Sequence, residues 1–229
     1  MPEASTVRRM FAGVAPRYDL LNRVLSLGID RRWRRDVVSG LKLKPSDRVL
    51  DLCCGTGDLA LELAPHARCL ACDFTWEMLT RAKAKSTRAG QAGQALHLAA
   101  AAALRLPFAA HQFDAATVGF GVRNLEDLAA GLREFRRVLR ANGPLVILEF
   151  SQPTHPLLRL PYQAYLHGLL PLIGRMVSTR KEAYRYLAES IAGFPNPETL
   201  SAILAAEGFR NIHYRRLTGG IVAIHTATA

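Results

Sequence analysis

The sequence lacks the features of an exported or membrane-spanning chain. Among its 229 residues, no apolar run reaches the ~18 uninterrupted residues that a spanning helix needs. The opening stretch MPEASTVRRMF has no apolar segment of the kind found in secretory signals, and a folded pattern begins by about residue 10. We therefore expect a cytoplasmic protein.

Cysteine is also scarce. The four cysteines are Cys53, Cys54, Cys69 and Cys72, which are too few and wrongly spaced for a disulfide framework or a zinc ribbon. The spacing Cys69-x-x-Cys72 is typical of redox motifs, but it lies within RCLACD, a pattern that indicates a buried strand. We interpret the cysteines as small packing residues and predict no metal site.

Acidic residues are outnumbered: 19 Asp and Glu stand against 30 Lys and Arg, giving a formal charge of +11. Such a charge favours anionic partners, which include nucleic acid, an acidic membrane surface and anionic cofactors. Aromatic residues make up only 7%, and no stacking platform of the RNP1 type is present. We predict no nucleic-acid partner, with an RNA-binding or RNA-modifying protein as the rival interpretation.

Apolar segments alternate with amphipathic ones along the middle of the chain. Short strands are expected at 48–52, 68–73, 95–99, 113–120 and 144–150, with helices at 57–64, 75–90 and 125–143 between them. This alternation predicts an α/β fold with a parallel, doubly wound sheet.

Outside that region the pattern changes. A basic helical stretch precedes residue 45, and a polar helix, a second helix (198–209) and two strands around Thr218-Gly219-Gly220 follow the apolar stretch at 153–178. The short turn predicts an antiparallel hairpin. We divide the chain into a helical cap, a cofactor-binding core, a helical insert or lid, and a segment completing the core sheet: 1–44, 45–152, 153–195 and 196–229.

The stretch VLDLCCGTGDLA, residues 49–60, reads as strand, glycine turn and helix. Gly55 and Gly57 allow a backbone to approach a nucleotide closely and to adopt positive φ. Asp73 follows Asp51 by 22 residues at the end of the next strand, which is the spacing at which an acid reaches a ribose hydroxyl. The alternative is an ordinary strand–turn–helix unit.

The turn is not G-x-G-x-x-G, the pattern that suits a pyrophosphate. Asp51 stands at the strand end, where an acid can organise the loop near a cationic ligand. A sulfonium or amino group fits this arrangement better than a pyrophosphate does, so S-adenosylmethionine is favoured over NAD.

The chain resembles the C-methyltransferases of menaquinone and ubiquinone biosynthesis, a family of class I S-adenosylmethionine-dependent methyltransferases. The motifs that carry the resemblance span nearly the whole chain: FAGVAPRYDLLNRVLSLGIDRRWR, VLDLCCGTGDLA, FGVRNLEDLAAGLREFRRVL, LVILEFSQP, YRYLAESI and LTGGIVAIH. It implies a Rossmann-like class I fold: a mostly parallel seven-stranded sheet with a C-terminal antiparallel hairpin and helices on both faces.

The resemblance also implies a reaction: C-methylation of a polyprenyl demethylmenaquinol in the last step of menaquinone biosynthesis. Demethylphylloquinol and a ubiquinone precursor are alternative acceptors, because the loop DLCCGTGD also resembles that of phylloquinone-forming relatives. The implied cofactor-binding residues are Asp51, Gly55, Thr56, Gly57, Asp73, Phe74 and Ala102.

A ring carbon becomes a good nucleophile only when the neighbouring phenol, with a pKa of ~10, loses its proton. Arg123 and Asn124 follow the fourth strand at the edge where ligands bind in open sheets, and they are our candidates for stabilising that charge. The alternative is that Arg123 pairs with Glu126 or Asp127 at a helix start. Tyr18 and Asp19 are candidates for closing over the cofactor or touching the quinol, the alternative being a packed and capped helix.

One position departs from the family pattern. An acid that binds the adenine amino group is expected after the third strand, and Ala102 stands in its place. A lost hydrogen bond is worth roughly 0.5–1.5 kcal/mol, or about tenfold in affinity. An inactive scaffold is therefore a further alternative.

The segment 153–178 is apolar and aromatic but interrupted by prolines and arginines, which argues against a membrane span. We interpret it as a lid that contacts the prenyl tail and the membrane surface, so that the protein would be peripherally membrane-associated. The alternative is a helical insert that packs on the domain or on a second copy in a homodimer.

Overall fold

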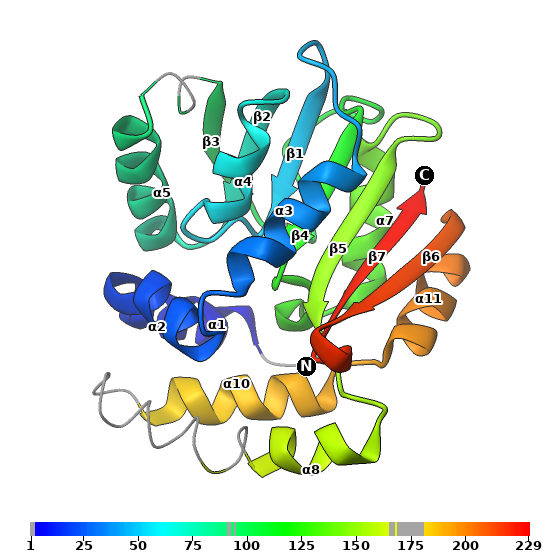
Figure 1. The fold of residues 1–229 in the computed structure, drawn as a ribbon. Coiled ribbons are helices and arrows are strands. Elements are labelled where there is room, and N and C mark those ends of the chain that lie inside the picture. Colours follow the sequence, from blue (N-terminus) through cyan, green and yellow to red (C-terminus); the bar gives the residue numbers. More distant parts are fainter. Residues whose placement is uncertain (1–2, 91–92, 94, 165–167, 169–180) are drawn as a thin grey trace.

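A seven-stranded sheet forms the centre of the computed structural model, which describes residues 3–90, 93, 95–164, 168 and 181–229. The strand order is β3-β2-β1-β4-β5-β7-β6 (Figure 1). Strands β1 to β5 run parallel, whereas β7 is antiparallel to both β5 and β6. The strands are β1 (Arg48–Leu52), β2 (Arg68–Asp73), β3 (Leu96–Ala100), β4 (Ala115–Gly119), β5 (Pro144–Phe150), β6 (Arg210–Leu217) and β7 (Val222–Thr228).

Helices cover both faces of the sheet. The described helices are α1 (Ala4–Val14), α2 (Tyr18–Leu25), α3 (Asp30–Gly40), α4 (Asp58–Leu63), α5 (Trp76–Arg88), α7 (Leu128–Val138), α8 (Pro156–Ala164), α10 (Lys181–Gly193) and α11 (Pro197–Ala206), with short 3-10 turns η1 (Ala15–Arg17), η2 (Val122–Asn124) and η4 (Thr218–Gly220). One buried cluster joins the sheet to α7 and α11, and a second joins its other face to α3 and α4. The predicted fold class is confirmed, including the C-terminal hairpin.

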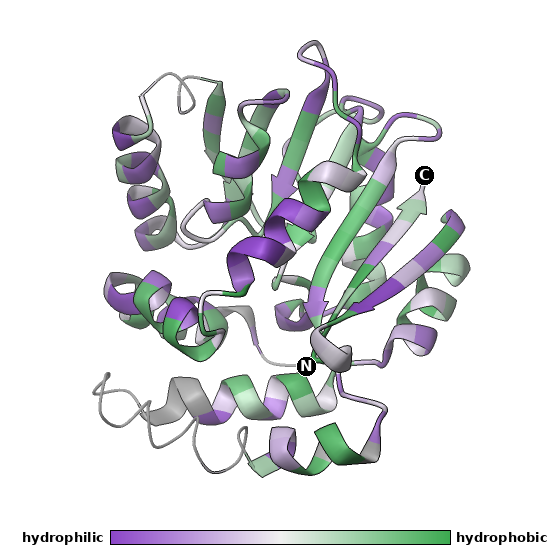
Figure 2. Ribbon diagram, viewed as in Figure 1, coloured by the Kyte–Doolittle hydropathy of each residue, from purple (hydrophilic) through white to green (hydrophobic). Residues whose placement is uncertain are grey.

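The alternation of side chains along the strands produces these two clusters. In β1, Val49 packs on the α3 and α4 side, while Leu50 and Leu52 pack on the α7 and α11 side. Strand β5 is hydrophobic through most of its length because it lies inside the sheet, whereas the edge strand β6 carries polar residues (Figure 2). Charged side chains on an edge strand disfavour pairing with another chain.

The predicted element boundaries are largely right, with local shifts. Strands at 48–52, 68–73 and 144–150 form as expected, but the third begins one residue later and the fourth is shorter. The helix expected over 125–143 forms only at Leu128–Val138. It begins there because the Asp127 side chain accepts a hydrogen bond from the Ala130 amide as an N-cap, and it ends because Leu139 has extended backbone.

The carboxyl ends of the parallel strands meet at one end of the molecule, where α1, α2, α8 and α10 lie (Figure 1). Ligands bind at this edge in open α/β sheets. In the part of the chain that the structure describes, no helix has the length and apolarity needed to cross a membrane. The four-segment division stays a prediction, and most of the stretch 165–180 within the predicted lid lies outside the described residues.

Candidate active site

The glycine turn after β1 packs directly against α5. Gly55 and Gly57 have φ of 54° and 80°, in the left-handed region that favours glycine. A Cβ added at Gly57 would stand 3.1 Å from the Cβ of Ala82, so the turn leaves little room for a side chain there. The sequence therefore places the N-terminus of α4 close to the carboxyl ends of β1 and β2.

Asp73 holds the shape of this turn. One carboxylate oxygen accepts a hydrogen bond from the Gly55 amide at 2.9 Å, and the other accepts from the Thr75 amide at 2.8 Å. Burial raises the pKa of this carboxyl, although the backbone donors oppose the shift. Each oxygen keeps further acceptor capacity, so the same group can bind ribose hydroxyls.

A cavity of about 210 Å³ opens beside the turn. Four of the predicted cofactor residues line it: Gly55, Asp73, Phe74 and Ala102. Ala102 is exposed and forms a backbone bridge with Arg105. The other three predicted residues, Asp51, Thr56 and Gly57, are not among the residues that line the cavity.

Asp51 lies beneath the loop. Its carboxyl is 1% exposed and accepts a hydrogen bond from the Thr117 hydroxyl at 2.7 Å. Burial, with a further contribution from the charge of Asp73, raises the pKa of Asp51 to about 7. Any effect of this carboxyl on a cation in the cavity would act through space rather than by direct contact.

Thr56 and Asp19 connect the turn to the N-terminal helices. The Thr56 hydroxyl donates to Asp19 at 2.5 Å, and Lys85 Nζ donates to Thr56 at 2.9 Å and pairs with Asp19 at 2.6 Å. Asp19 thus lines neither cavity and instead holds α2 against the glycine turn and α5.

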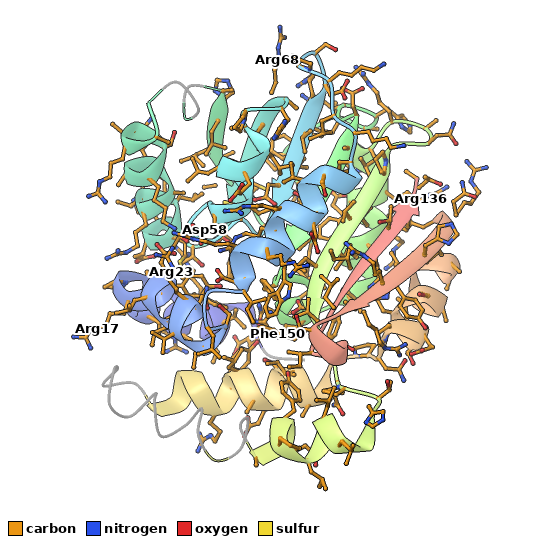
Figure 3. The ribbon with its side chains drawn as sticks, viewed as in Figure 1. Arg17, Arg23, Asp58, Arg68, Arg136 and Phe150 are labelled. Carbon is orange, nitrogen blue, oxygen red and sulfur yellow. The ribbon has the colours of Figure 1, made fainter. Side chains whose placement is uncertain are left out.

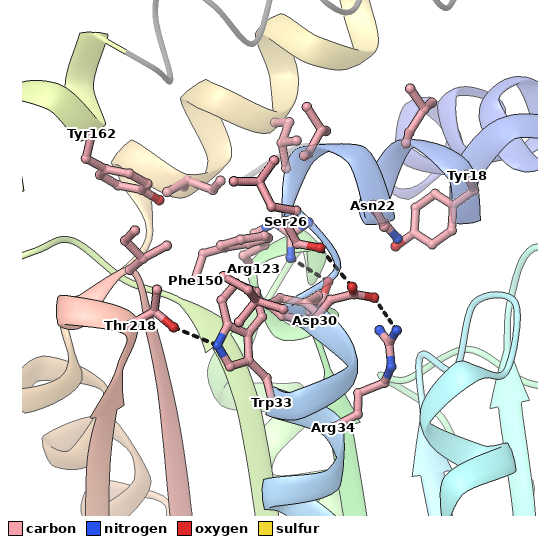
Figure 4. Close-up of a pocket in the computed structure, with 18 of the residues that line it drawn as sticks. Tyr18, Asn22, Ser26, Asp30, Trp33, Arg34, Arg123, Phe150, Tyr162 and Thr218 are labelled. Atoms are coloured by element: carbon pink, nitrogen blue, oxygen red, sulfur yellow. Dashed lines mark hydrogen bonds and ion pairs between the residues drawn. The ribbon is translucent and has the colours of Figure 1, made fainter.

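A larger, mainly apolar cavity of about 440 Å³ adjoins the first (Figure 4). Its walls come from α1, α2, α3, α8 and α10, together with the ends of β4 and β5. Phe11, Tyr18 and Phe120 line both cavities. Burial raises the pKa of the Tyr18 hydroxyl, so it stays protonated at neutral pH.

Arg123 lies in the wall of the larger cavity, bound to a partner on β5. Its Nη1 donates to Glu149 at 2.8 Å and to the Phe120 carbonyl at 2.5 Å, and the guanidinium lies 5.2 Å from the centre of the Phe150 ring. The ion pair that Arg123 forms here is with Glu149, and Asp127 caps α7. Burial raises the pKa of Glu149, and the charge of Arg123 opposes that shift.

Asn124 lines the smaller cavity and is held from two sides. Its Oδ1 accepts a hydrogen bond from the Tyr186 hydroxyl at 2.8 Å, and its Nδ2 donates weakly to the Phe120 carbonyl at 3.4 Å. Phe120 has a φ of 58°, which is rare for a side chain of this size. Its ring packs against Phe150 at 4.6 Å and Trp33 at 6.1 Å between centroids.

The comparisons with known proteins agree with this geometry. The model of the ubiE/COQ5 methyltransferase family matches residues 2–229. A demethylmenaquinone methyltransferase of Mycolicibacterium vanbaalenii is 48% identical over 223 residues, covering 97% of this chain and 94% of that protein. A ubiquinone/menaquinone biosynthesis C-methyltransferase UbiE of Citrifermentans bemidjiense is 44% identical, with coverage of 97% and 95%.

The chain belongs to the ubiE/COQ5 methyltransferase family. Its fold is shared with more distant structures, among them the [4+2]-cyclase SpnF (TM-score 0.72, 16% identity, 99% of this chain and 97% of that chain). A SAM-dependent methyltransferase from Aquifex aeolicus has a TM-score of 0.60 at 16% identity, with coverage of 85% and 88%.

Membership in the family makes S-adenosylmethionine the expected cofactor, and the smaller cavity fits it with one exception. The Asp73 carboxylate suits ribose hydroxyls, and the face of Phe74 suits an adenine ring. A Cβ on Gly55 would lie 3.9 Å from Tyr18 Cε1 and would fill the space between the turn and α2. The exception is Ala102, which offers no acceptor for the adenine amino group.

Three residues of the site were not predicted from the sequence: Glu149, Tyr186 and Lys85. Glu149 gave a signal, because it is the single charged residue in the apolar stretch PLVILEF. Tyr186 and Lys85 lie on amphipathic helices among other polar residues, and nothing in their spacing distinguishes them.

The cysteines also differ from expectation. Cys53, Cys54 and Cys72, interpreted as packing residues, line the smaller cavity, and Cys69 and Cys72 are buried in β2. Burial raises the pKa of all four thiols, so they stay protonated and poorly nucleophilic. Among the described residues, no three His, Cys, Asp or Glu side chains are grouped as metal ligands would be.

Proposed function

We propose that this chain methylates a ring carbon of reduced, polyprenyl-tailed demethylmenaquinone, using S-adenosylmethionine, in the last step of menaquinone biosynthesis. The observation that carries the proposal is the pairing of a glycine-turn cavity with a larger apolar cavity across a shared aromatic wall. The names of the relatives support the acceptor class. When bound, S-adenosylmethionine supplies an electrophilic methyl group on a sulfonium.

Arg123 is the residue best placed to stabilise the phenolate form of the acceptor. Its Nη1 is committed to Glu149 and to the Phe120 carbonyl, but its buried Nε has no hydrogen-bond partner in the described structure. An unsatisfied donor on a cation is an attractive partner for a phenolate oxygen. Such a contact would lower the pKa of the phenol and favour loss of its proton.

Asn124 and Tyr18 present polar groups in fixed positions on the cavity walls. Asn124 is fixed by Tyr186, which comes from α10, so the amide at the boundary of the two cavities has a defined orientation. Tyr18 offers a protonated hydroxyl on the wall that both cavities share. The aromatic rings of Trp33, Phe120 and Phe150 supply an apolar surface for the acceptor ring.

The same apolar cavity suits demethylphylloquinol or a ubiquinone precursor, because these differ in the nucleus or tail and not in the class of chemistry. Because a tailed quinol resides in a bilayer, the proposal includes peripheral contact with a membrane. A homodimer and the absence of a nucleic-acid partner stay predictions.

The test is transfer of a labelled methyl group from S-adenosylmethionine. Reduced demethylmenaquinone, reduced demethylphylloquinone and RNA serve as parallel acceptors, with oxidised demethylmenaquinone as the matched control. We expect label in a quinol and none in the oxidised quinone, because only the reduced ring can form a phenolate. Label in RNA alone, or in no quinol under reducing conditions, would reject the proposal.

A further inference from the structure

Large exposed apolar side chains gather on two helices. Of nine such residues in the described part of the chain, seven lie on α2, on the turn after it, or on α8. They are Leu20, Val24, Leu27, Ile29, Leu157, Leu158 and Leu160, hereafter the leucine face. The most exposed are Leu27, Leu157 and Leu160, at 86%, 77% and 73%. Large apolar side chains gathered at the surface in this way mark an interaction surface.

Part of the leucine face belongs to the wall of the larger cavity. Leu27, Ile29 and Leu158 are exposed and also line that cavity. Behind them, Leu21 of α2 and Tyr162 of α8 pack in one buried cluster with α10. Helices α2 and α8 therefore each bury one side in the same small core and expose leucines to solvent on a different side.

The exposed charged side chains of α2 and of the start of α3 are arginines: Arg23, Arg31 and Arg32. The two acids of this stretch are paired, Asp19 with Lys85 and Asp30 with Arg34. Arg23 is exposed on α2, and Figure 3 shows Arg17 projecting away from that helix.

We propose that the leucine face docks on an anionic lipid bilayer and passes the lipid substrate from the bilayer directly into the larger cavity. Leucines inserted at the interface supply the apolar contact, and arginines beside them attract anionic headgroups. The identity of the lipid substrate rests on the proposed function, whereas the docking does not. A bilayer is favoured over a protein partner because three exposed apolar residues of the face also line the cavity, and exposed arginines lie beside them on α2 and α3.

The first experiment measures sedimentation of the protein with vesicles of phosphatidylcholine, with and without phosphatidylglycerol. The variant Leu20→Gln/Leu157→Gln/Leu160→Gln alters three face residues that do not line the cavity. The matched control is Trp76→Gln, an equally exposed large apolar residue outside the face. We expect at least tenfold weaker binding for the triple variant and a change below twofold for the control.

The electrostatic part has its own pair of variants. Arg23→Gln should weaken binding to anionic vesicles by about fivefold, with the effect fading at high salt. Arg68→Gln removes an exposed arginine at the opposite end of the molecule and should leave binding unchanged (Figure 3). Equal losses in both variants would show that only net charge matters and would overturn the assignment to this face.

A second readout separates this inference from the proposed function. The triple variant should keep wild-type methyl transfer to a short-tailed, water-soluble naphthoquinol and lose it with a quinol embedded in vesicles. Wild-type protein that binds vesicles but methylates neither acceptor would reject the proposed function alone. The docking proposal is overturned if wild type does not bind vesicles, if the triple variant binds equally well, or if the triple variant merely converts a dimer to a monomer.

Discussion

The ion pair of Arg123 and Glu149 is buried in the wall of an apolar cavity, with 5% and 2% of the side chains exposed. Removing two charges from water is costly, and their mutual attraction offsets that cost only when geometry is good. Replacing both partners with apolar residues is often tolerated, whereas removing one leaves a buried charge without compensation. Comparing a single with a double replacement therefore distinguishes the contribution of the pair to stability from the contribution of Arg123 to the reaction.

We predict that Glu149→Gln lowers the free energy of unfolding by about 3–5 kcal/mol, measured by urea denaturation. The double variant Arg123→Met/Glu149→Leu should recover most of that loss but show no methyl transfer, because its phenolate-stabilising cation is gone. A double variant that transfers methyl groups at the wild-type rate would exclude Arg123 from the reaction.

Ala102 gives a gain-of-function prediction. The substitution Ala102→Asp places an acceptor in the wall of the smaller cavity, and we expect S-adenosylmethionine to bind about tenfold more tightly in calorimetry. Ala110→Asp adds the same charge at an exposed position outside the cavity and controls for net charge. Equal affinities for both variants would show that adenine lies elsewhere.

At the scale of elements, a chain of charged side chains joins four helices. Lys85 of α5 contacts Asp19 of α2 and Asp58 of α4, each at 2.6 Å, and Asp58 lies 3.3 Å from Arg34 of α3. Single exposed ion pairs contribute little, but these are partly buried and share members. The network holds the N-terminal helices over both cavities.

We expect Lys85→Met to loosen that attachment. Hydrogen exchange in α1 and α2 should become faster, and affinity for S-adenosylmethionine should fall several-fold, because Asp19 and Asp58 lose their shared cation. Lys83→Met, on the exposed side of the same helix, should change neither quantity. Unaltered exchange in α2 after Lys85→Met would mean that apolar packing alone holds the helices.

Local sequence patterns predicted the strands well because each combines apolar residues with a turn signal, as RVLDL does before its glycines. They did not predict Arg123 with Glu149, since that contact depends on how β4 and β5 align. The side chain of Asp19 was expected near the ligands but faces Lys85, because a helix orientation is set by partners distant in sequence. The sequence therefore identified the edge of the sheet at which the site lies. The hydrogen-bond and ion-pair partners of each side chain became known only from the fold.

At the scale of the whole molecule, three carboxyls at the carboxyl edge are buried and have raised pKa values: Asp51, Asp73 and Glu149. Desolvation is the main cause in each case. Each folded carboxyl holds its proton to a higher pH than its unfolded counterpart, whose pKa is about 4. At pH values between the unfolded and the folded pKa of a carboxyl, unfolding therefore releases its proton.

The free energy of unfolding should therefore fall as the pH rises from about 4 to about 7, with Asp51 alone contributing a few kcal/mol because its folded pKa is about 7. His225 opposes this below its ordinary pKa, since burial lowers the pKa of its imidazole and the stability from that group rises with pH. Urea denaturation across the range should show a shallower slope for Asp51→Asn than for wild type. Identical slopes would mean that the Asp51 carboxyl ionises normally.

Phe11, Tyr18 and Phe120 line both cavities, so the two chambers share one aromatic boundary. We expect the two ligands to bind non-independently, with each changing the affinity of the other by the same factor, because coupling free energy is reciprocal. Titrating either ligand with the other present measures that factor, and a value of one would show a rigid boundary. A factor above one would mean that the methyl donor is held more tightly once the acceptor is bound.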